Sequence, residues 1–452
     1  MTTDIKTYKQ ENKFTSRQTL IFVLCLIAYS CAYLNRLHIS IALPSITESL
    51  GIGKENAGII TMSFFWTYAI GQLISGWLGD KISPKYMIGI GLGMSSVCCF
   101  ILSFMNTTLG ISIMWALNGI FQSMLWAPIM KVISGNFSGE KLQRASFGIS
   151  FSLVIGHMVA WASSSVFDMV FENWRIIFIV PAVIVAVFVV AWFILFKENR
   201  SEQVAEEKIS SSENGSGFGF LKIKYMPTVF IILMGICLTH GIVKEGVGTW
   251  FPTILKEFFK ITDESAIAVL IIVPVINFAG LLLTKFVSNK TGANSFFMLT
   301  VLYLITAVST LILYFCQIIP LIVLVLIILL EGLMYATNPV LTTFIPVSFT
   351  KYNCVSTIAG AMDCIIYVGA ALATFVTGII APETCECEGS VVCNSCGLES
   401  CDCAVKICNA CGLEVGGDWS GVFLFWLGTI VVGVVLSLLL VYFNKKQEKT
   451  EK

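Results

Sequence analysis

The stretch RLHISIALPSI, residues 36–46, places one arginine within a long apolar segment and a proline, Pro44, eight residues after it. The stretch KEGVGTWFPTI, residues 244–254, repeats this spacing with Lys244 and Pro252. The two stretches lie 208 positions apart, close to half of the 452-residue chain. Matched spacing around a lone cation in apolar surroundings indicates an internal duplication, and a duplication constrains the fold more strongly than local propensity does.

A second pair of stretches repeats at nearly the same offset. LISGWLGDKISPK (73–85) aligns with LLTKFVSNKTGAN (282–294) at a distance of 209 positions. Both copies follow an apolar segment of similar length. The chain is therefore predicted to consist of two copies of one unit, and such repeats in membrane proteins meet at a central site near the bilayer midplane.

The composition is that of a polytopic membrane protein. Hydrophobic residues make up 56% of the chain and charged residues 12%, with a mean hydropathy of +0.85, whereas soluble domains carry roughly a quarter charged residues. This excludes a soluble globular protein and a disordered chain. Lys+Arg and Asp+Glu both number 28, so no net charge favours a nucleic-acid partner. Stretches long enough to cross a bilayer fall at twelve places: 19–45, 57–79, 86–105, 109–131, 146–168, 175–196, 228–252, 265–287, 295–315, 319–342, 355–380 and 421–443.

The predicted fold is all-α, with twelve transmembrane helices arranged as two pseudo-symmetric six-helix bundles. Lys and Arg are distributed unevenly, with 21 in the segments assigned to the inside and four in outside loops. By the positive-inside rule both termini are expected in the cytoplasm, and the expected location is the plasma membrane. The expected parts are a cytoplasmic N-terminus (1–18), a first bundle (19–196), a cytoplasmic linker (197–226), a second bundle (227–443) with an extracellular cysteine-rich insert (383–418), and a cytoplasmic tail (444–452).

The loop GWLGDKISPKY, residues 76–86, resembles the signature loop of the major facilitator superfamily, G-x-L-x-D-R/K-x-x-x-R/K. The resemblance implies that this loop gates the alternation between two states. Gly76 would permit close helix approach, and Asp80 would pair with Lys81 and Lys85 at the cytoplasmic end. An ordinary basic turn is the alternative. The second copy of the loop lacks both the glycine and the aspartate.

Two cations within apolar segments define the candidate binding site. Arg36 lies mid-helix, where a charge costs at least ~2.5–3.5 kcal/mol to insert, and Lys244 holds the same place in the second repeat. If both face one cavity, they form a clamp for a dianionic group, and an arginine can add bidentate bonds to a phosphate or carboxylate. The alternative is an internal ion pair of Lys244 with Glu245 or with Asp363.

Five segments resemble the organophosphate:phosphate antiporters, which include bacterial glycerol-3-phosphate and hexose-6-phosphate transporters. The similarity covers the first eight predicted helices well and the next three more loosely, and it breaks at about residue 382. The segments are YSCAYLNRLHISIALPSI (29–46), NGIFQSMLWAPIMKVI (118–133), GISFSLVIGHMVA (148–160), NWRIIFIVPAVIVA (173–186) and GTWFPTILKEFF (248–259).

This resemblance implies a set of substrate-binding residues. In that family two arginines bind the phosphate; Arg36 matches the first, and Lys244 stands in the place of the second. The remaining members are aromatic and imidazole side chains at matched positions: Tyr29, Tyr33, Tyr68, His157 and Tyr367. For each of these the alternative is a structural role in helix packing.

Further ionisable residues fall within apolar segments. Asp363 and Glu331 are acids in the predicted helices 11 and 10, and His38 and His240 lie near the cation pair in sequence. Protonatable groups beside a binding site suit proton coupling. Pairing of the acids with the cations, or a place at a helix end, is the alternative.

Half of the sixteen cysteines crowd into the insert as two copies of C-x-C…C-x-x-C-G-L-E. Four thiols per copy could hold one tetrahedral Zn²⁺. Disulfides are the alternative, and an extracellular location favours them. The candidate metal ligands are Cys385, Cys387, Cys393, Cys396, Cys401, Cys403, Cys408 and Cys411.

The expected function is secondary active transport of a small organic anion by alternating access, with exchange of a phosphate ester for phosphate as one form. The alternatives are proton-coupled symport of a carboxylate such as a sugar acid, and a transporter-like membrane sensor. GxxxxGK[ST] does not occur, so an ATP-driven pump is unsupported, and no nucleophile–base constellation indicates an enzyme. No cofactor is expected for transport, and a monomer in the lipid bilayer is expected, with phosphate or protons as counter-ion.

Overall fold

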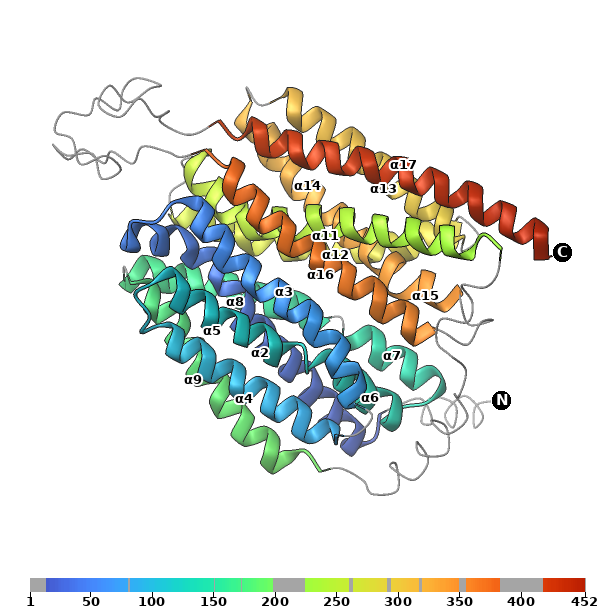
Figure 1. The fold of residues 1–452 in the computed structure, drawn as a ribbon. Coiled ribbons are helices and arrows are strands. Elements are labelled where there is room, and N and C mark those ends of the chain that lie inside the picture. The colour runs from blue at the N-terminus through green and yellow to red at the C-terminus, as the bar shows by residue number, and fades with distance from the viewer. Residues whose placement is uncertain are drawn as a thin grey trace, which may run out of the picture.

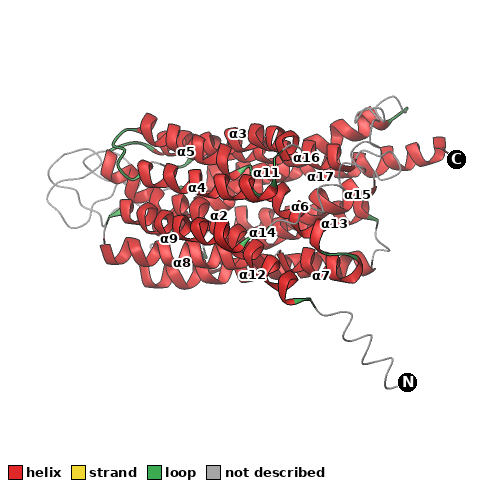
Figure 2. Cartoon of the chain, turned by 90° about the horizontal axis from the view of Figure 1, so that it is seen from below, coloured by secondary structure: helices red, strands yellow, loops and turns green. Residues whose placement is uncertain are grey.

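The computed structural model describes residues 14–79, 82–149, 151–171, 173–197, 224–259, 263–290, 294–316, 319–348, 355–382 and 418–451. Throughout these ranges the chain is helical, with short turns between helices and no strand (Figure 2). The tail before residue 14, nearly all of the predicted linker, and the cysteine-rich insert lie outside the described residues.

The long helices coincide with the apolar stretches of the sequence, and short helices such as α7 and α15 lie between those stretches. In the first half they are α2 (Ser16–Leu50), α3 (Lys54–Gly79), α4 (Pro84–Leu102), α5 (Thr108–Gln122), α6 (Trp126–Asn136), α7 (Gly139–Ile149), α8 (Phe151–Phe171) and α9 (Trp174–Leu195). In the second half they are α11 (Met226–Glu257), α12 (Asp263–Lys290), α13 (Ser295–Phe315), α14 (Pro320–Pro339), the π-helical turn η2 (Val340–Phe344), α15 (Ile345–Ser348), α16 (Val355–Ile380) and α17 (Ser420–Glu451).

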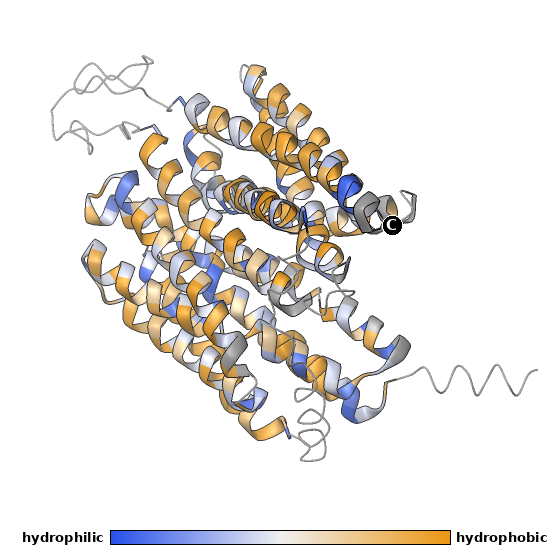
Figure 3. Cartoon of the chain, turned by 45° about the vertical axis from the view of Figure 1, so that its right-hand side comes forward, coloured by the Kyte–Doolittle hydropathy of each residue, from blue (hydrophilic) through white to orange (hydrophobic). Residues whose placement is uncertain are grey.

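Length and surface composition agree with a membrane-spanning bundle. Eleven helical segments within the described ranges are long and apolar enough to cross a bilayer, and α12 adds a 28-residue helix with an apolar stretch at Ile272–Thr284. Large apolar side chains point away from the core, with Leu109 70% and Phe315 71% exposed, and apolar residues dominate the helices in Figure 3. Water would penalise such a surface, whereas lipid would not. The predicted all-α polytopic fold is confirmed.

Helix packing is the same in the two halves. In the first half α2 packs on α8, α3 on α5, and α4 on both α5 and α9. In the second half α11 packs on α16, α12 on α14, and α13 on both α14 and α17. Each pair in one half corresponds to the pair six spans later, so the duplication seen in the sequence is present as two pseudo-symmetric bundles, which lie side by side (Figure 1).

The span predicted at 109–131 is interrupted by a turn at residues 123–125, which separates α5 from α6. Pro128 lies in the first turn of α6. In a continuous helix this proline would lack the N–H that bonds the carbonyl of Met124, and its ring would clash with that carbonyl. The N–H of Leu125 instead bonds the carbonyl of Gln122 at 3.3 Å. The predicted span is therefore one membrane crossing, Thr108–Asn136, whose helix is interrupted by this turn.

The halves meet along α3 with α16, α8 with α12, and α2 with α11. At one end of the molecule glycines allow α3 and α16 to approach closely. A Cβ on Gly58 would lie 2.9 Å from the carbonyl oxygen of Thr374, and a Cβ on Gly378 would lie 2.6 Å from that of Lys54. Only glycine leaves room for two backbones at this separation.

Two ion pairs join the halves at the same end. The Nζ of Lys54, at the start of α3, lies 2.6 Å from a carboxylate oxygen of Glu257 at the end of α11, and it also donates to the carbonyl of Pro382. The Nζ of Lys256 lies 2.9 Å from Asp168 near the end of α8. We name these four charged residues, Lys54, Asp168, Lys256 and Glu257, the end latch, because they hold the two bundles closed at this end.

Candidate functional site

A narrow cavity lies between the two bundles. Residues of both halves line it, and they include both cations singled out in the sequence. Its walls are Arg36, Leu37, Ile39 and Ser40 of α2; Thr61, Phe64 and Phe65 of α3; Trp115 of α5; His157 and Trp161 of α8; Lys244, Glu245, Gly248 and Thr249 of α11; and Glu331 and Tyr335 of α14.

Arg36 is held in a cage of aromatic rings. Its guanidinium carbon lies between 5.0 and 5.5 Å from four ring centroids, those of Phe64, Phe65, Tyr68 and Tyr367. Its Nη1 also donates to the hydroxyl of Tyr367 at 3.4 Å. Ring faces attract a cation most strongly where water is absent, and Arg36 is only 8% exposed. The cage therefore holds a permanent positive charge at the cavity wall.

A buried polar network fixes the backbone of α2 next to this arginine. The side-chain amide of Asn35 donates to Ser95 at 3.3 Å and to Ser96 at 3.2 Å. The amide of Asn118 donates to the carbonyl of Asn35 at 3.0 Å, and Ser95 donates to Asn118 at 2.6 Å. Because α2, α4 and α5 all contribute, rotation of α2 would break several buried hydrogen bonds at once.

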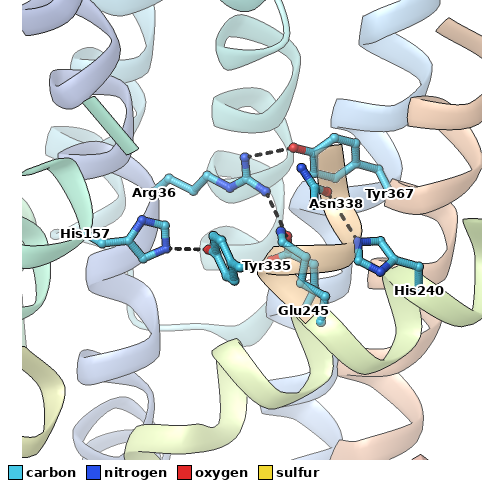
Figure 4. A network of polar contacts seen from close by, with 8 residues as sticks. Arg36, His157, His240, Glu245, Tyr335, Asn338 and Tyr367 are labelled. Carbon is cyan, nitrogen blue, oxygen red and sulfur yellow. Dashed lines mark hydrogen bonds and ion pairs between the residues drawn. The ribbon is translucent and has the colours of Figure 1, made fainter. Parts of the chain in front are cut away.

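Lys244 is paired with its neighbour in the sequence. Its Nζ lies 2.5 Å from Oε1 of Glu245, and the same oxygen lies 3.9 Å from Nη2 of Arg36. Lys244 also lies 4.9 Å from the ring centroid of Tyr335. Figure 4 shows Glu245 directed toward the guanidinium of Arg36. Of the two partners that the sequence left open for Lys244, the structure has Glu245.

A hydrogen bond joins the halves across the cavity. Nε2 of His157 and the hydroxyl of Tyr335 are 3.0 Å apart (Figure 4). The ring of Tyr33 lies against that of His157 at 4.9 Å, and Tyr29 meets Tyr33 edge to face at 5.3 Å. These two tyrosines therefore stand behind His157.

All seven sequence-predicted binding residues lie at this cavity or next to a residue that lines it. Arg36, His157 and Lys244 line it directly. Tyr68 and Tyr367 contact Arg36. Tyr33 contacts His157, and Tyr29 contacts Tyr33. Glu245 and Tyr335 were not among the predicted binding residues. Tyr335 has a sequence signal, since it follows Glu331 by four residues and so shares its helix face.

Of the other ionisable residues, Glu331 lines the cavity, whereas Asp363 and His240 are not among the described residues that line it. Glu331 is buried and lines the cavity, with Oε1 3.3 Å from where a Cβ on Gly248 would be. Asp363 is half-buried on α16 and is not among the described residues that line the cavity. His240 lies 3.3 Å from Oδ1 of Asn338.

His38, which lies near the cation pair in the sequence, is not among the described residues that line the cavity. Its ring packs edge to face on Phe178 at 4.4 Å and on Trp115 at 5.7 Å. Its Nδ1 lies 2.7 Å from the carbonyl oxygen of Leu34. The side chain is fully buried within the first bundle, where aromatic packing and a backbone hydrogen bond account for it.

Part of the predicted gating loop and all of the predicted metal ligands lie outside the described residues. Asp80, Lys81 and the eight cysteines of the insert belong to this group, and Gly76 is described only as part of the backbone of α3. Lys85 lies in the first turn of α4, where its carbonyl accepts a hydrogen bond from the indole N–H of Trp192 at 3.0 Å. Within the described ranges there is no cluster of three His, Cys, Asp or Glu side chains that could hold a metal ion.

Comparison with known proteins agrees with this architecture. The chain is 24% identical to the probable hexose phosphate transport protein of Chlamydia pneumoniae over 177 residues, 38% of each chain. It is 23% identical to the hexuronate transporter of Bacillus subtilis over 279 residues, 61% of this chain and 65% of that one. Both matched segments thus span less than two thirds of the relative's length.

The fold is also found among solved transporters. A bacterial homolog of the human lysosomal transporter Spinster superposes with a TM-score of 0.70 at 13% identity, covering 97% of this chain and 98% of the other. The sequence pattern of the Major Facilitator Superfamily matches residues 25–374, a range that contains every residue lining the cavity. The chain belongs to the Major Facilitator Superfamily and is an integral membrane protein.

Proposed function

We propose that this protein is a secondary active transporter that moves a small organic anion across the membrane by alternating access. One observation carries the proposal, namely the caged guanidinium of Arg36 at the wall of a cavity between two pseudo-symmetric bundles. Rocking of such bundles exposes a central site to either side in turn. The names of the relatives, a hexose phosphate transport protein and a hexuronate transporter, support an anionic substrate.

In this proposal Arg36 and Lys244 bind the anion, since both cations line the cavity from opposite halves. Tyr68 and Tyr367 hold Arg36 in place. His157, which packs against Tyr33, faces Tyr335 of α14 across the cavity. Closure of the cavity around the anion then depends on contacts made by both bundles, which couples binding to rocking.

Two forms of energy coupling are open to such a site. Exchange for phosphate needs only the cations. Proton symport needs an acid that exchanges a proton as the cavity opens, and Glu331 at the cavity wall and Asp363 on α16 are the residues for that role. A pH gradient imposed on proteoliposomes separates them, because it drives uptake only in the proton-coupled form.

The loop after α3 is proposed to gate the cytoplasmic end, with Gly76, Asp80, Lys81 and Lys85 as its members. Both termini are proposed to be cytoplasmic in the plasma membrane, from the distribution of Lys and Arg. That assignment places the end latch on the outer side. A monomer is proposed as the transporting unit.

The deciding experiment is flux through the full-length protein in proteoliposomes, loaded and assayed with a hexuronate and with a hexose 6-phosphate. Arg36→Ala should abolish flux of every anion that the wild type moves. Arg36→Lys should retain less than about a tenth of it, because the ammonium lacks the two-pronged geometry of the guanidinium. Arg17→Ala, which removes an exposed arginine from the same helix, is the matched control.

Full flux in Arg36→Ala would reject the binding-site assignment. Saturable binding of either anion with no counterflow would favour the sensor alternative, because a sensor binds its ligand without moving it.

A further inference from the structure

The carboxylate of Glu245 is built into the cation site. It lies 2.5 Å from Nζ of Lys244 and 3.9 Å from Nη2 of Arg36. The side chains of Lys244 and Glu245 are both 13% exposed. Since these two residues are adjacent on α11, the carboxylate moves together with the ammonium when the second bundle moves.

The charges around the cavity can be added. Arg36 and Lys244 contribute two positive charges, and Glu245 removes one of them. Nε2 of His157 lies 3.0 Å from the phenol oxygen of Tyr335, a contact that either protonation state of the ring can make. We count the imidazole as neutral at pH 7.5 because histidine ordinarily titrates below this pH. Glu331, which lines the same cavity, can only lower the total further. The described walls thus carry a net charge of at most +1.

A site of this charge does not match a dianion. A bound monoanion is balanced by the walls, whereas a phosphate monoester dianion leaves at least one excess negative charge in a poorly hydrated space. It would also approach the carboxylate of Glu245, and like charges brought together away from water carry a heavy penalty. Selectivity of this kind comes from a repulsive element as much as from an attractive one.

We propose that Glu245 is a specificity-determining residue that restricts this site to organic anions with a single negative charge, such as carboxylates and sulfonates, over phosphate monoesters. The inference rests on the proposed function, in that the substrate binds at the Arg36–Lys244 pair. It selects among the substrate classes that the proposed function leaves open.

The test compares two ligands on a common sugar scaffold, a hexuronate and a hexose 6-phosphate, by equilibrium binding to the purified full-length protein at pH 7.5. At this pH the phosphate ester is mostly a dianion, because its second pKa is about 6. The wild type should bind the hexuronate more tightly. Glu245→Gln should shift the ratio of the two Kd values toward the phosphate ester by about tenfold or more. Glu48→Gln, which removes an exposed carboxylate at the end of α2, should leave the ratio unchanged.

A second variant covers the case in which Glu245→Gln fails to fold because Lys244 loses its partner. The double variant Lys244→Gln/Glu245→Gln removes the pair together and leaves the net charge of the walls as it was. It should keep the wild-type preference for the hexuronate, although it binds both ligands more weakly.

The outcomes separate this inference from the proposed function. A Kd ratio within twofold of wild type in Glu245→Gln, or a wild type that prefers the phosphate ester, overturns the role of Glu245. A double variant that prefers the phosphate ester overturns it too. Loss of both ligands in Arg36→Ala would uphold the binding site in each of those cases. Arg36→Ala with wild-type affinity for both ligands would reject the proposed site itself.

Discussion

At the scale of single residues, the site depends on how a permanent charge is kept in an apolar interior. Arg36 faces four aromatic rings and makes one long hydrogen bond, to Tyr367. A hydroxyl at 3.4 Å is a weak partner, whereas each well-placed ring face contributes roughly 0.5–2 kcal/mol. The rings of the cage therefore matter more than the hydroxyl.

This difference can be measured at Tyr367. Tyr367→Phe keeps the ring and should change the Kd for the transported anion by less than about threefold. Tyr367→Ala removes one wall of the cage and should raise the Kd by about tenfold or more, because the guanidinium loses its fixed orientation. Binding to the purified protein is the measurement. Equal losses in the two variants would mean that the hydroxyl, and not the ring, positions Arg36.

Asn118 acts on the same arginine through the backbone of α2. Asn118→Leu should lower the free energy of unfolding by about 1–3 kcal/mol, because the carbonyl of Asn35 and the hydroxyl of Ser95 lose buried partners. Thermal unfolding in detergent would show this as a lower Tm. Thr306→Val, which removes a buried hydroxyl bonded only within its own helix turn, is the control, and a Tm loss as large as that of Asn118→Leu would contradict the network.

At the scale of helices, the end latch determines how firmly the bundles hold together on one side. Lys54 and Glu257 belong to different halves and are only 13% and 11% exposed, so water and salt screen their attraction little. The close approach of α3 and α16 at Gly58 brings this end of the two halves into contact. Opening the cavity at this end requires both ion pairs to break.

Breaking the latch should therefore change transport without changing the site. Glu257→Gln should lower the maximal flux by about two- to tenfold and alter the Kd less than about threefold, since the latch residues do not line the cavity. The charge exchange Lys54→Glu/Glu257→Lys should recover at least half of the loss. Lys445→Gln, an exposed change at the far end of α17, serves as the control.

The single variant Lys54→Glu should also lower the maximal flux. A maximal flux in the charge-exchange variant no higher than in Lys54→Glu alone would show that the ion pair has no gating role. A large change in Kd with unchanged maximal flux would instead connect the latch to the binding site.

At the scale of the whole molecule, we expect the cysteine-rich insert to be separate from the transport machinery. It lies in the sequence between the end of α16 at Ile380 and the start of α17 at Ser420, and the described residues that line the cavity belong to other helices. The eight cysteines have metal-ligand spacing, and few apolar residues accompany them, so the insert should fold only when it is cross-linked.

Replacing residues 384–417 by a short Gly/Ser turn should therefore preserve binding of the anion and at least part of the flux. Asp418 is kept because its carboxylate accepts the N–H of Ser420 at 2.8 Å at the start of α17. Elemental analysis of the intact protein should find close to two zinc ions per chain if metal holds the insert. Eight thiols that resist alkylation until reduced, with no zinc, would assign disulfides. Loss of anion binding on deletion would show that the insert is part of the site.

Much of this architecture could be predicted from the sequence, because a bilayer imposes a length on each apolar stretch. The stretches 295–315 and 355–380 coincide with α13 and α16. The duplication placed Arg36 and Lys244 at equivalent positions. The family resemblance predicted that His157 and Tyr367 belong to the same site, where His157 lines the cavity and Tyr367 contacts Arg36. These features depend on local composition and on repetition along the chain.

Other features required the packed structure. The turn that separates α5 from α6 lies within an apolar run, so hydropathy alone gives one span. The side chain of His38 lies in aromatic packing, two residues from an arginine that faces the cavity, since a helix turns successive side chains to different sides. The four rings around Arg36 come from α3 and α16, helices that belong to different halves of the chain.

The sequence by itself determined that this is a membrane protein of two repeated six-helix units with a cation in each, because hydropathy and repetition are properties of the linear chain. The tertiary structure alone decided that Glu245 neutralises Lys244 and also approaches Arg36. The physical reason is that an ion pair depends on distances of a few ångströms across two bundles. Adjacent residues in a sequence offer such a pair, but only the packing of α2 against α11 brings the second cation to it.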